Sequence, residues 1–132
     1  MWDVRIATVE EQGMAAIAPA VLDRWFTRDF RHGAPQQLET VRAMLVATPA
    51  AGYTASCAAV RDMDQRDQLP AITAPTLVIA GRQDLATPLA DARLLAARIP
   101  GATCVELDAA HLSNWEVPQA FNNALLAFLQ RA

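Results

Sequence analysis

Two stretches, PTLVIAGRQDLATP at residues 75–88 and ATCVELDAAHLSNW at residues 102–115, decide the fold. In each, a short run of apolar and β-branched residues is followed by a polar loop. The run over residues 76–80 is of the kind that a parallel strand covered on both faces requires. Between the two runs, residues 87–98 show a helical pattern capped at Thr87-Pro88, with Leu89, Leu95 and Ile99 facing inward, and Pro118 begins another helix. This order of strand, helix, strand and helix predicts a parallel α/β sheet.

Residues 1–69 show only helical periodicity. The spacing predicts a first helix capped by Asp3 and a second that begins at Pro19. A loop is expected over residues 27–35, where glycine and proline occur. Pro35 and the pair Thr48-Pro49 each begin a further helix, and the polar residues 61–67 end the section. The chain therefore divides into a helical section (1–69) and a strand–helix section (70–132).

The strand–helix section is too small to form a covered sheet by itself. Parallel sheets have both faces covered and usually contain several strands, whereas only two convincing strands occur here. We therefore expect this chain to be the C-terminal part of a larger α/β protein. Its uncovered strand edge and apolar helix faces predict a homo-oligomer, or association with the missing N-terminal half.

Charge and cysteine content exclude several classes of partner. The chain has 11 basic residues and 14 acidic residues, for a formal net charge of -3, which gives no reason to expect nucleic acid or an anionic membrane. No apolar run approaches the roughly 20 residues that cross a bilayer, and the first residues do not resemble a secretory signal. Cys57 and Cys104 lack CxxC spacing and a neighbouring His, so we expect free thiols in a reducing cytoplasm and no metal site.

The chemistry is expected in the two loops that follow the strands. Asp84 follows the first strand and His111 follows the second. The carboxyl ends of parallel strands meet at one edge of a sheet, where ligands and catalytic groups gather. An Asp and a His that meet there can form the acid–base half of a Ser-His-Asp triad. The order of Asp84 before His111 fits the last two members of the α/β-hydrolase order, Ser, Asp and then His.

Simpler interpretations exist for each of these residues taken alone. An Asp after a strand is most often a loop cap, and a lone His is usually an ordinary loop residue, as we expect for His32. The only serines, Ser56 and Ser113, do not stand in a G-x-S-x-G motif, so neither is a credible nucleophile. Gly81 is expected to serve backbone freedom.

The same residues resemble a known family. The stretches over residues 75–88 and 99–121 are similar to the C-terminal end of α/β-hydrolases, and most similar to 3-oxoadipate enol-lactonases. The segments RWFT (24–27) and GYTASCAAVRDMDQRD (52–67) resemble the helical cap of that family. The resemblance implies that Asp84 is the triad acid, that His111 is the triad base, and that residues 1–69 form the cap over the pocket. It also implies that the nucleophile serine and the oxyanion hole belong to the N-terminal part.

The resemblance further implies an activity. The family hydrolyses 3-oxoadipate enol-lactone to 3-oxoadipate in bacterial degradation of aromatic compounds, without a cofactor. The substrate carries a carboxylate, so Arg24 and Arg61 are candidates to bind it, because an Arg fork can hold a carboxylate through two bonds. Trp25 and Trp115 are candidates to line the pocket, although core packing explains them equally well.

Three hypotheses therefore stand after the sequence alone. The chain is part of an enol-lactonase that lacks turnover by itself, because the serine is absent. Alternatively, it belongs to another α/β-hydrolase with the same Asp–His pair, such as an esterase or a C–C bond hydrolase. The third hypothesis is a catalytically silent helical module that associates through its apolar faces.

Overall fold

The computed structural model describes residues 1–131, and these form two compact units. The first unit consists of Met1–Asp23 and Arg31–Asp64, and the second consists of Arg24–Phe30 and the chain from Gln65 onward. The helical section predicted over residues 1–69 extends further than the first unit, which ends at Asp64. Residues 24–30 and 65–69 group instead with the strands.

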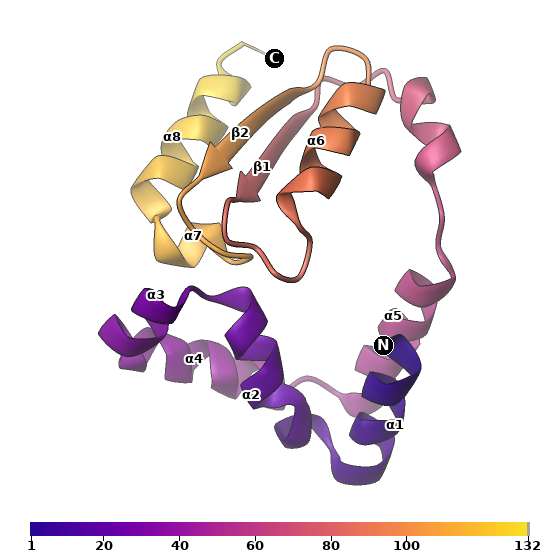
Figure 1. The fold of residues 1–132 in the computed structure, drawn as a ribbon, viewed down its shortest axis with the longest axis vertical. Helices are drawn as coiled ribbons and strands as arrows, with labels where there is room; N and C mark the ends of the chain where they lie inside the picture. Colours follow the sequence, from indigo (N-terminus) through magenta and orange to yellow (C-terminus); the bar gives the residue numbers. More distant parts are fainter. Residues whose placement is uncertain (132) are drawn as a thin grey trace. The chain divides into compact units, whose positions relative to one another are not determined.

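Five helices account for the first 62 residues (Figure 1): α1 (Trp2–Gln12), α2 (Met14–Trp25), α3 (Arg28–Gly33), α4 (Pro35–Val46) and α5 (Ala50–Asp62). Within the first unit, α1 packs against α5. Its buried side chains are almost all aliphatic: Val9, Met14, Ile17, Ala18, Val21, Leu22, Val41, Leu45 and Cys57. These apolar residues recur at helical spacing, so the core of this unit is formed by helix faces alone.

The first helix boundary differs from the prediction. The chain breaks at Gly13, whose φ of 79° lies in the left-handed region that favours glycine, and α2 begins directly afterwards. Pro19 therefore lies inside α2 and does not begin it. The predicted cap at Asp3 is also wrong, because Met1 precedes the helix and Asp3 instead forms an ion pair with Arg61.

The later helices of this section follow the prediction more closely. Pro35 is the first residue of α4, as expected, and Val41 and Leu45 are buried. The predicted loop over residues 27–35 is wrong in part, because it contains the short helix α3. Thr48 does not cap α5, since its hydroxyl donates to the carbonyl of Met44 and Pro49 takes the capping position.

The second unit contains the two predicted strands and the helices between and after them. The elements are the 3-10 helix η1 (Arg66–Ala71), β1 (Leu77–Gly81), α6 (Leu89–Arg98), β2 (Thr103–Leu107), α7 (Ser113–Glu116) and α8 (Pro118–Leu129). The strands pair in parallel, with Leu77 opposite Thr103 and Gly81 opposite Leu107. The two strands therefore end at the same edge, as predicted.

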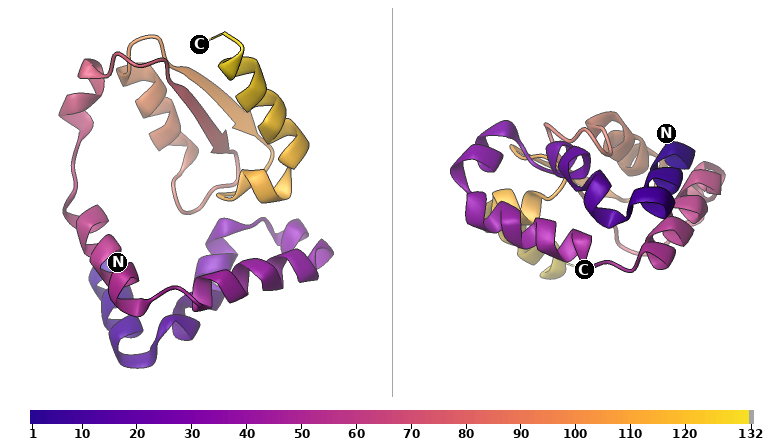
Figure 2. Two further views of the ribbon diagram at one scale, coloured as in Figure 1. Left: turned by 180° about the vertical axis from the view of Figure 1, so that it is seen from behind. Right: turned by 90° about the horizontal axis from the view of Figure 1, so that it is seen from below.

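The helices α6 and α8 cover opposite faces of this strand pair (Figures 1 and 2). Side chains alternate between the faces of a strand. Glu106 points to the α6 side, where Arg93 pairs with it. Its neighbour Val105 points to the other side and lines a cavity with Phe128 of α8. The strand pair is thus the middle layer of a three-layer α/β arrangement.

The apolar helix faces are less covered than the sequence suggested. In α6 the buried residues are Ala92 and the following Ile99, whereas Leu95 is exposed, contrary to the prediction. In α8 no residue is fully buried, and Leu126 and Leu129 are 55% and 58% exposed. These two leucine side chains of α8 therefore lie open in this unit.

Candidate active site

The loop after β1 holds Asp84 through hydrogen bonds to the backbone of that same loop. The N–H of Asp84 donates to the carbonyl of Gly81 (3.3 Å), which closes a tight turn at the end of the strand. The carboxylate Oδ1 then accepts the backbone N–H groups of Ala86 (2.7 Å) and Thr87 (2.9 Å). The side chain is only 6% exposed. The bonds within this loop therefore hold the Asp84 carboxylate in one orientation without any contact from the second loop.

The loop after β2 lies directly on the end of β1. Arg82 and Gln83 donate backbone hydrogen bonds to the carbonyls of Leu107 (2.8 Å) and Ala109 (3.0 Å). A Cβ at Gly81 would lie 2.1 Å from the carbonyl oxygen of Ala110. Gly81 is therefore needed for space, and the expected backbone freedom is not the reason, since its φ is not positive.

These two loops bring Asp84 and His111 into contact. Nδ1 of His111 lies 2.8 Å from Oδ2 of Asp84, within hydrogen-bonding distance, which confirms the predicted geometry. Since a carboxylate only accepts, Nδ1 carries the proton, and Nε2 of the neutral ring is left as the acceptor. The imidazole is 32% exposed, so the loop holds the ring without burying it completely. This is the arrangement of the acid and the base in a Ser-His-Asp triad.

Thr87 belongs to the same cluster, although the sequence suggested only a helix cap. Its hydroxyl donates to Oδ2 of Asp84 (2.8 Å) and lies 3.2 Å from Nδ1 of His111. An Asp in a turn often accepts backbone N–H groups of the residues that follow it, so this part of the cluster could be expected from the sequence. Burial alone would raise the pKa of Asp84, but hydrogen bonds from His111, Thr87 and Ala86 outweigh it and lower that pKa below 3.8. The carboxylate is therefore kept charged for the imidazole.

Residues 24 and 25 contact both loops of this site. Arg24 donates from Nη2 to the carbonyl of Leu85 (3.1 Å), and the carbonyl of Trp25 accepts the N–H of Leu112 (3.1 Å). The indole of Trp25 stacks near the imidazole of His111, with ring centroids 6.2 Å apart. Two of the four predicted pocket residues, Arg24 and Trp25, therefore lie beside the Asp84–His111 pair.

The other candidates are described by contacts within their own unit. Arg61 belongs to the first unit, where Asp62 and Asp3 engage its guanidinium and raise its pKa. Trp115 lies in α7 and is half-buried. Ser56 is an exposed residue of α5 that donates to the carbonyl of Gly52, and Ser113 is buried at the start of α7. His32 is an exposed residue of α3.

Glu116, which the sequence analysis did not single out, connects residues 24–30 to the His111 loop. Its carboxylate accepts the N–H and the hydroxyl of Thr27 and the N–H of Ala110. Thr27 and Glu116 are 89 positions apart, so no local pattern indicates this contact.

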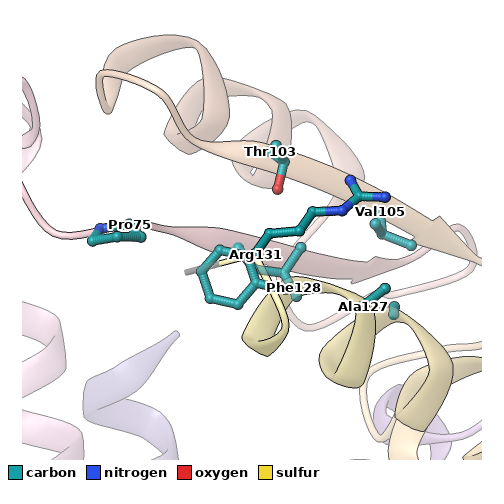
Figure 3. A pocket seen from close by; sticks show the side chains of 8 residues that line it. Pro75, Thr103, Val105, Ala127, Phe128 and Arg131 are labelled. Atoms are coloured by element: carbon teal, nitrogen blue, oxygen red, sulfur yellow. The ribbon is translucent and has the colours of Figure 1, made fainter.

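A cavity of about 400 Å³ lies on the α8 side of the strand pair (Figure 3). Its lining is mostly apolar and consists of Pro75, Leu77, Thr103, Val105, Ala124, Ala127, Phe128 and Arg131. Neither Asp84 nor His111 belongs to it. The cavity is therefore separate from the acid–base pair.

The described residues show no metal-binding group and no single spanning helix. Over residues 1–131, no three His, Cys, Asp or Glu side chains lie close enough together to hold a metal ion. No single helix in this range is long and apolar enough to cross a membrane, and α4 with α5 reaches that length only as a pair bent by 90°. Both cysteines are free, with Cys57 buried and Cys104 half-buried.

Comparison with known proteins places this geometry in context. The profile of the alpha/beta hydrolase fold matches residues 10–118. The chain is 42% identical over 130 residues to 3-oxoadipate enol-lactonase 2 of Acinetobacter baylyi, covering 98% of this chain and 49% of that protein. It is 33% identical to 3-oxoadipate enol-lactonase 1 of the same organism, covering 98% of this chain and 48% of that protein.

Solved structures of hydrolases also match nearly the whole of this chain with about half of their own length. The enol-lactonase from Burkholderia xenovorans is 42% identical, with a TM-score of 0.96 over 98% of this chain and 50% of that one. A thermophilic esterase from Thermogutta terrifontis is 28% identical, with a TM-score of 0.88 over 96% of this chain and 47% of that one. The chain therefore spans about half the length of the relatives it matches.

Proposed function

The chain belongs to the α/β-hydrolase family, and we propose that its Asp84 and His111 are the acid and the base of a Ser-His-Asp triad that hydrolyses 3-oxoadipate enol-lactone to 3-oxoadipate. One observation carries the proposal: the 2.8 Å contact between Oδ2 of Asp84 and Nδ1 of His111 at the ends of neighbouring parallel strands. The choice of substrate rests on the similarity to enol-lactonases over 98% of the chain.

The reaction follows from the assigned tautomer. Nε2 of His111 takes the proton of a serine hydroxyl while the serine oxygen attacks the lactone carbonyl carbon. The ring C–O bond breaks, the leaving oxygen takes that proton from the imidazolium, and an acyl-enzyme remains. His111 then takes a proton from water, the water oxygen attacks the acyl carbon, and the serine leaves with the proton. Asp84 stabilises the imidazolium at both steps. Side chains and water suffice, so the proposal includes no cofactor.

The nucleophile is proposed to lie outside these 132 residues. Ser56 is committed to a bond inside its own helix, and Ser113 is buried at the start of α7. Neither follows a strand in the sharp turn that exposes a nucleophilic serine in this family. We accordingly propose that the isolated chain is inactive and that it works as part of a longer protein or with a complementary half. The two free thiols are consistent with a cytoplasmic location.

Arg24 is the candidate to bind the substrate carboxylate. Its guanidinium donates to the carbonyl of Leu85, directly after Asp84, within the second unit. We propose that Trp25, whose ring lies over His111, lines the same part of the pocket. Replacing Arg24 by Gln should therefore raise KM for the lactone and leave KM for a neutral aryl ester nearly unchanged.

A chimera tests the proposal directly. In it, this chain replaces the matched half of the enol-lactonase from Burkholderia xenovorans. The chimera should hydrolyse the enol-lactone, and Asp84→Asn and His111→Ala should each reduce kcat by about 10³-fold or more. Asp108→Asn is the matched control, since this carboxylate lies on the loop of His111 but accepts a hydrogen bond from the side chain of Gln83. Normal turnover by the Asp84 and His111 variants would refute the proposal.

A simple esterase is the second candidate function. It is favoured by the likeness to the esterase from Thermogutta terrifontis, whose structure shares the same half-chain match. The two candidates differ in the ratio of kcat/KM for the enol-lactone to that for an aryl acetate. A chimera that prefers the aryl acetate by about 100-fold or more, or 2.7 kcal/mol, would favour the esterase.

A further inference from the structure

Glu116 joins two segments that are distant in the sequence. It is the last residue of α7, five positions after His111. Its Oε1 accepts the backbone N–H of Thr27 (3.0 Å) and the backbone N–H of Ala110 (3.1 Å), and its Oε2 accepts the Thr27 hydroxyl (2.7 Å). Three donors on one half-buried carboxylate make this a specific connection, because charge-assisted bonds are short and directional.

The segment that contains Ala110 also carries the imidazole of His111, the proposed base. Ala110 is 1% exposed and immediately precedes His111. On one side, the carbonyl oxygens of Ala109 and Ala110 approach Gly81 so closely that no Cβ would fit. Glu116 accepts the N–H of the same Ala109–Ala110 peptide. The backbone that leads into His111 is therefore fixed between the end of β1 and the Glu116 carboxylate.

The second segment carries the residues beside the imidazole. The Thr27 hydroxyl also accepts the N–H of Phe30 (3.2 Å), in the manner of an N-cap for α3. Two residues earlier, the carbonyl of Trp25 accepts the N–H of Leu112 (3.1 Å). Residues 25–27 are therefore bonded directly to Leu112, which follows His111, and are connected to Ala110, which precedes it, only through the Glu116 carboxylate.

We propose that Glu116 is a positioning residue: it ties Thr27 to the Ala110 peptide and thereby sets the orientation of His111 toward Asp84. The inference rests on the proposed function, in which His111 is the catalytic base. Glu116 acts through the backbone, and it is not a catalytic residue. The same carboxylate also fixes residues 24–30. Glu116 therefore positions both His111 and the segment that contains Arg24 and Trp25.

The test uses a spectroscopic signature in the 132-residue chain. The Nδ1 proton of His111, shared with Asp84, should give a far-downfield ¹H resonance that exchanges slowly with water. Glu116→Ala should raise that exchange rate by about tenfold or more, which corresponds to 1.4 kcal/mol of lost protection. Thr27→Val, which removes the hydroxyl but keeps the shape, should give a smaller increase, and Thr27→Ser should restore slow exchange.

The control is Glu106→Ala, which removes a carboxylate of β2 that pairs with Arg82 and Arg93. It should leave the resonance unchanged. If Glu116→Ala fails to fold, Glu116→Gln and Thr27→Val decide the matter, because each removes only part of the connection. Unchanged exchange in both of these folded variants would overturn the inference.

Kinetics in the chimera separate this inference from the proposed function. Glu116→Gln should lower kcat about tenfold with little change in KM, because a misplaced base affects the chemical step. A wild-type chimera without any hydrolysis would refute the proposed function, while the proton signature would still report on Glu116. An active chimera in which Glu116→Gln retains full kcat and the proton signature would refute the positioning role alone.

Discussion

Replacing Gly81 by Ala should open the contact between Asp84 and His111. The added Cβ would lie 2.1 Å from the carbonyl oxygen of Ala110 and 2.4 Å from that of Ala109, whereas real Cβ contacts stay above 3.0 Å. Both neighbours are backbone atoms and cannot rotate away, so the backbone carbonyl groups of Ala109 and Ala110 must retreat by about 1 Å. His111 follows directly, and a displacement of this size would lengthen the 2.8 Å bond to about 3.8 Å, beyond hydrogen-bonding distance.

The energetic cost follows from the same geometry. Overpacking of this kind costs about 1–3 kcal/mol, and the lost entropy of the unfolded chain returns only about 0.4–1 kcal/mol of it. We therefore expect the free energy of unfolding in urea to fall by about 1–2 kcal/mol. In the same variant, the Nδ1 proton resonance of His111 should broaden or disappear.

Gly52→Ala is the matched control for this prediction. Gly52 lies inside α5, and a Cβ there would meet nothing within 4 Å. That variant should be more stable than the wild type by about 0.5–1 kcal/mol, because Ala is the better helix former. The reasoning would be refuted by a Gly81→Ala chain that is as stable as the wild type and keeps the slowly exchanging proton.

Three further predictions concern acid, activity and association. Because the pKa of Asp84 is lowered in the folded chain, its stabilisation is present above pH 3.8 and is lost as the pH falls further; urea unfolding from pH 7 to pH 3 should show a steeper loss in the wild type than in Asp84→Asn, and parallel curves would contradict this. The isolated chain should show negligible hydrolysis of aryl esters, and any turnover abolished by Ser56→Ala or Ser113→Ala would show that a nucleophile had been overlooked. Since Leu126 and Leu129 are more than half exposed, the chain should sediment at micromolar concentration as a dimer or larger, and changing both to Ser should shift it toward monomer; a wild-type monomer of 14.3 kDa would argue against this association.

The strands and the acid–base pair were predictable because their signals are local. A short apolar run can be recognised without knowing its neighbours. The strand β1 is shifted by one residue at both ends from the run expected over residues 76–80, and β2 begins one residue after Ala102, where the second strand was expected to begin. Once two strands are parallel and adjacent, the loops after them must meet at one edge. The contact between Asp84 and His111 therefore followed from the strand assignment and residue order.

The helix boundaries were harder because two local signals competed. Pro19 is a plausible first residue of a helix, yet the chain breaks earlier, at Gly13, where a left-handed φ is available. Thr48 and Thr87 both precede a proline and both suggested a cap. In the structure one hydroxyl bonds back into α4, and the other bonds to Asp84. The sequence identifies a residue that can cap, but the competing acceptors decide whether it does.

The remainder of the site was not predictable because it depends on contacts between segments that are far apart. Residues 24–30 carry the helical pattern of the first section, yet they belong to the strand-containing unit and are bonded to the His111 loop. Glu116 would look like any surface acid in a short helix, since its three donors come from Thr27 and Ala110. A charged group with such partners stabilises only one arrangement of the two segments, because separating them would leave a half-buried carboxylate with unsatisfied acceptors. The orientation of His111 therefore depends on residues on both sides of the predicted boundary at residue 70. Dividing the chain there into an independent cap and core would separate His111 from the segment that orients it.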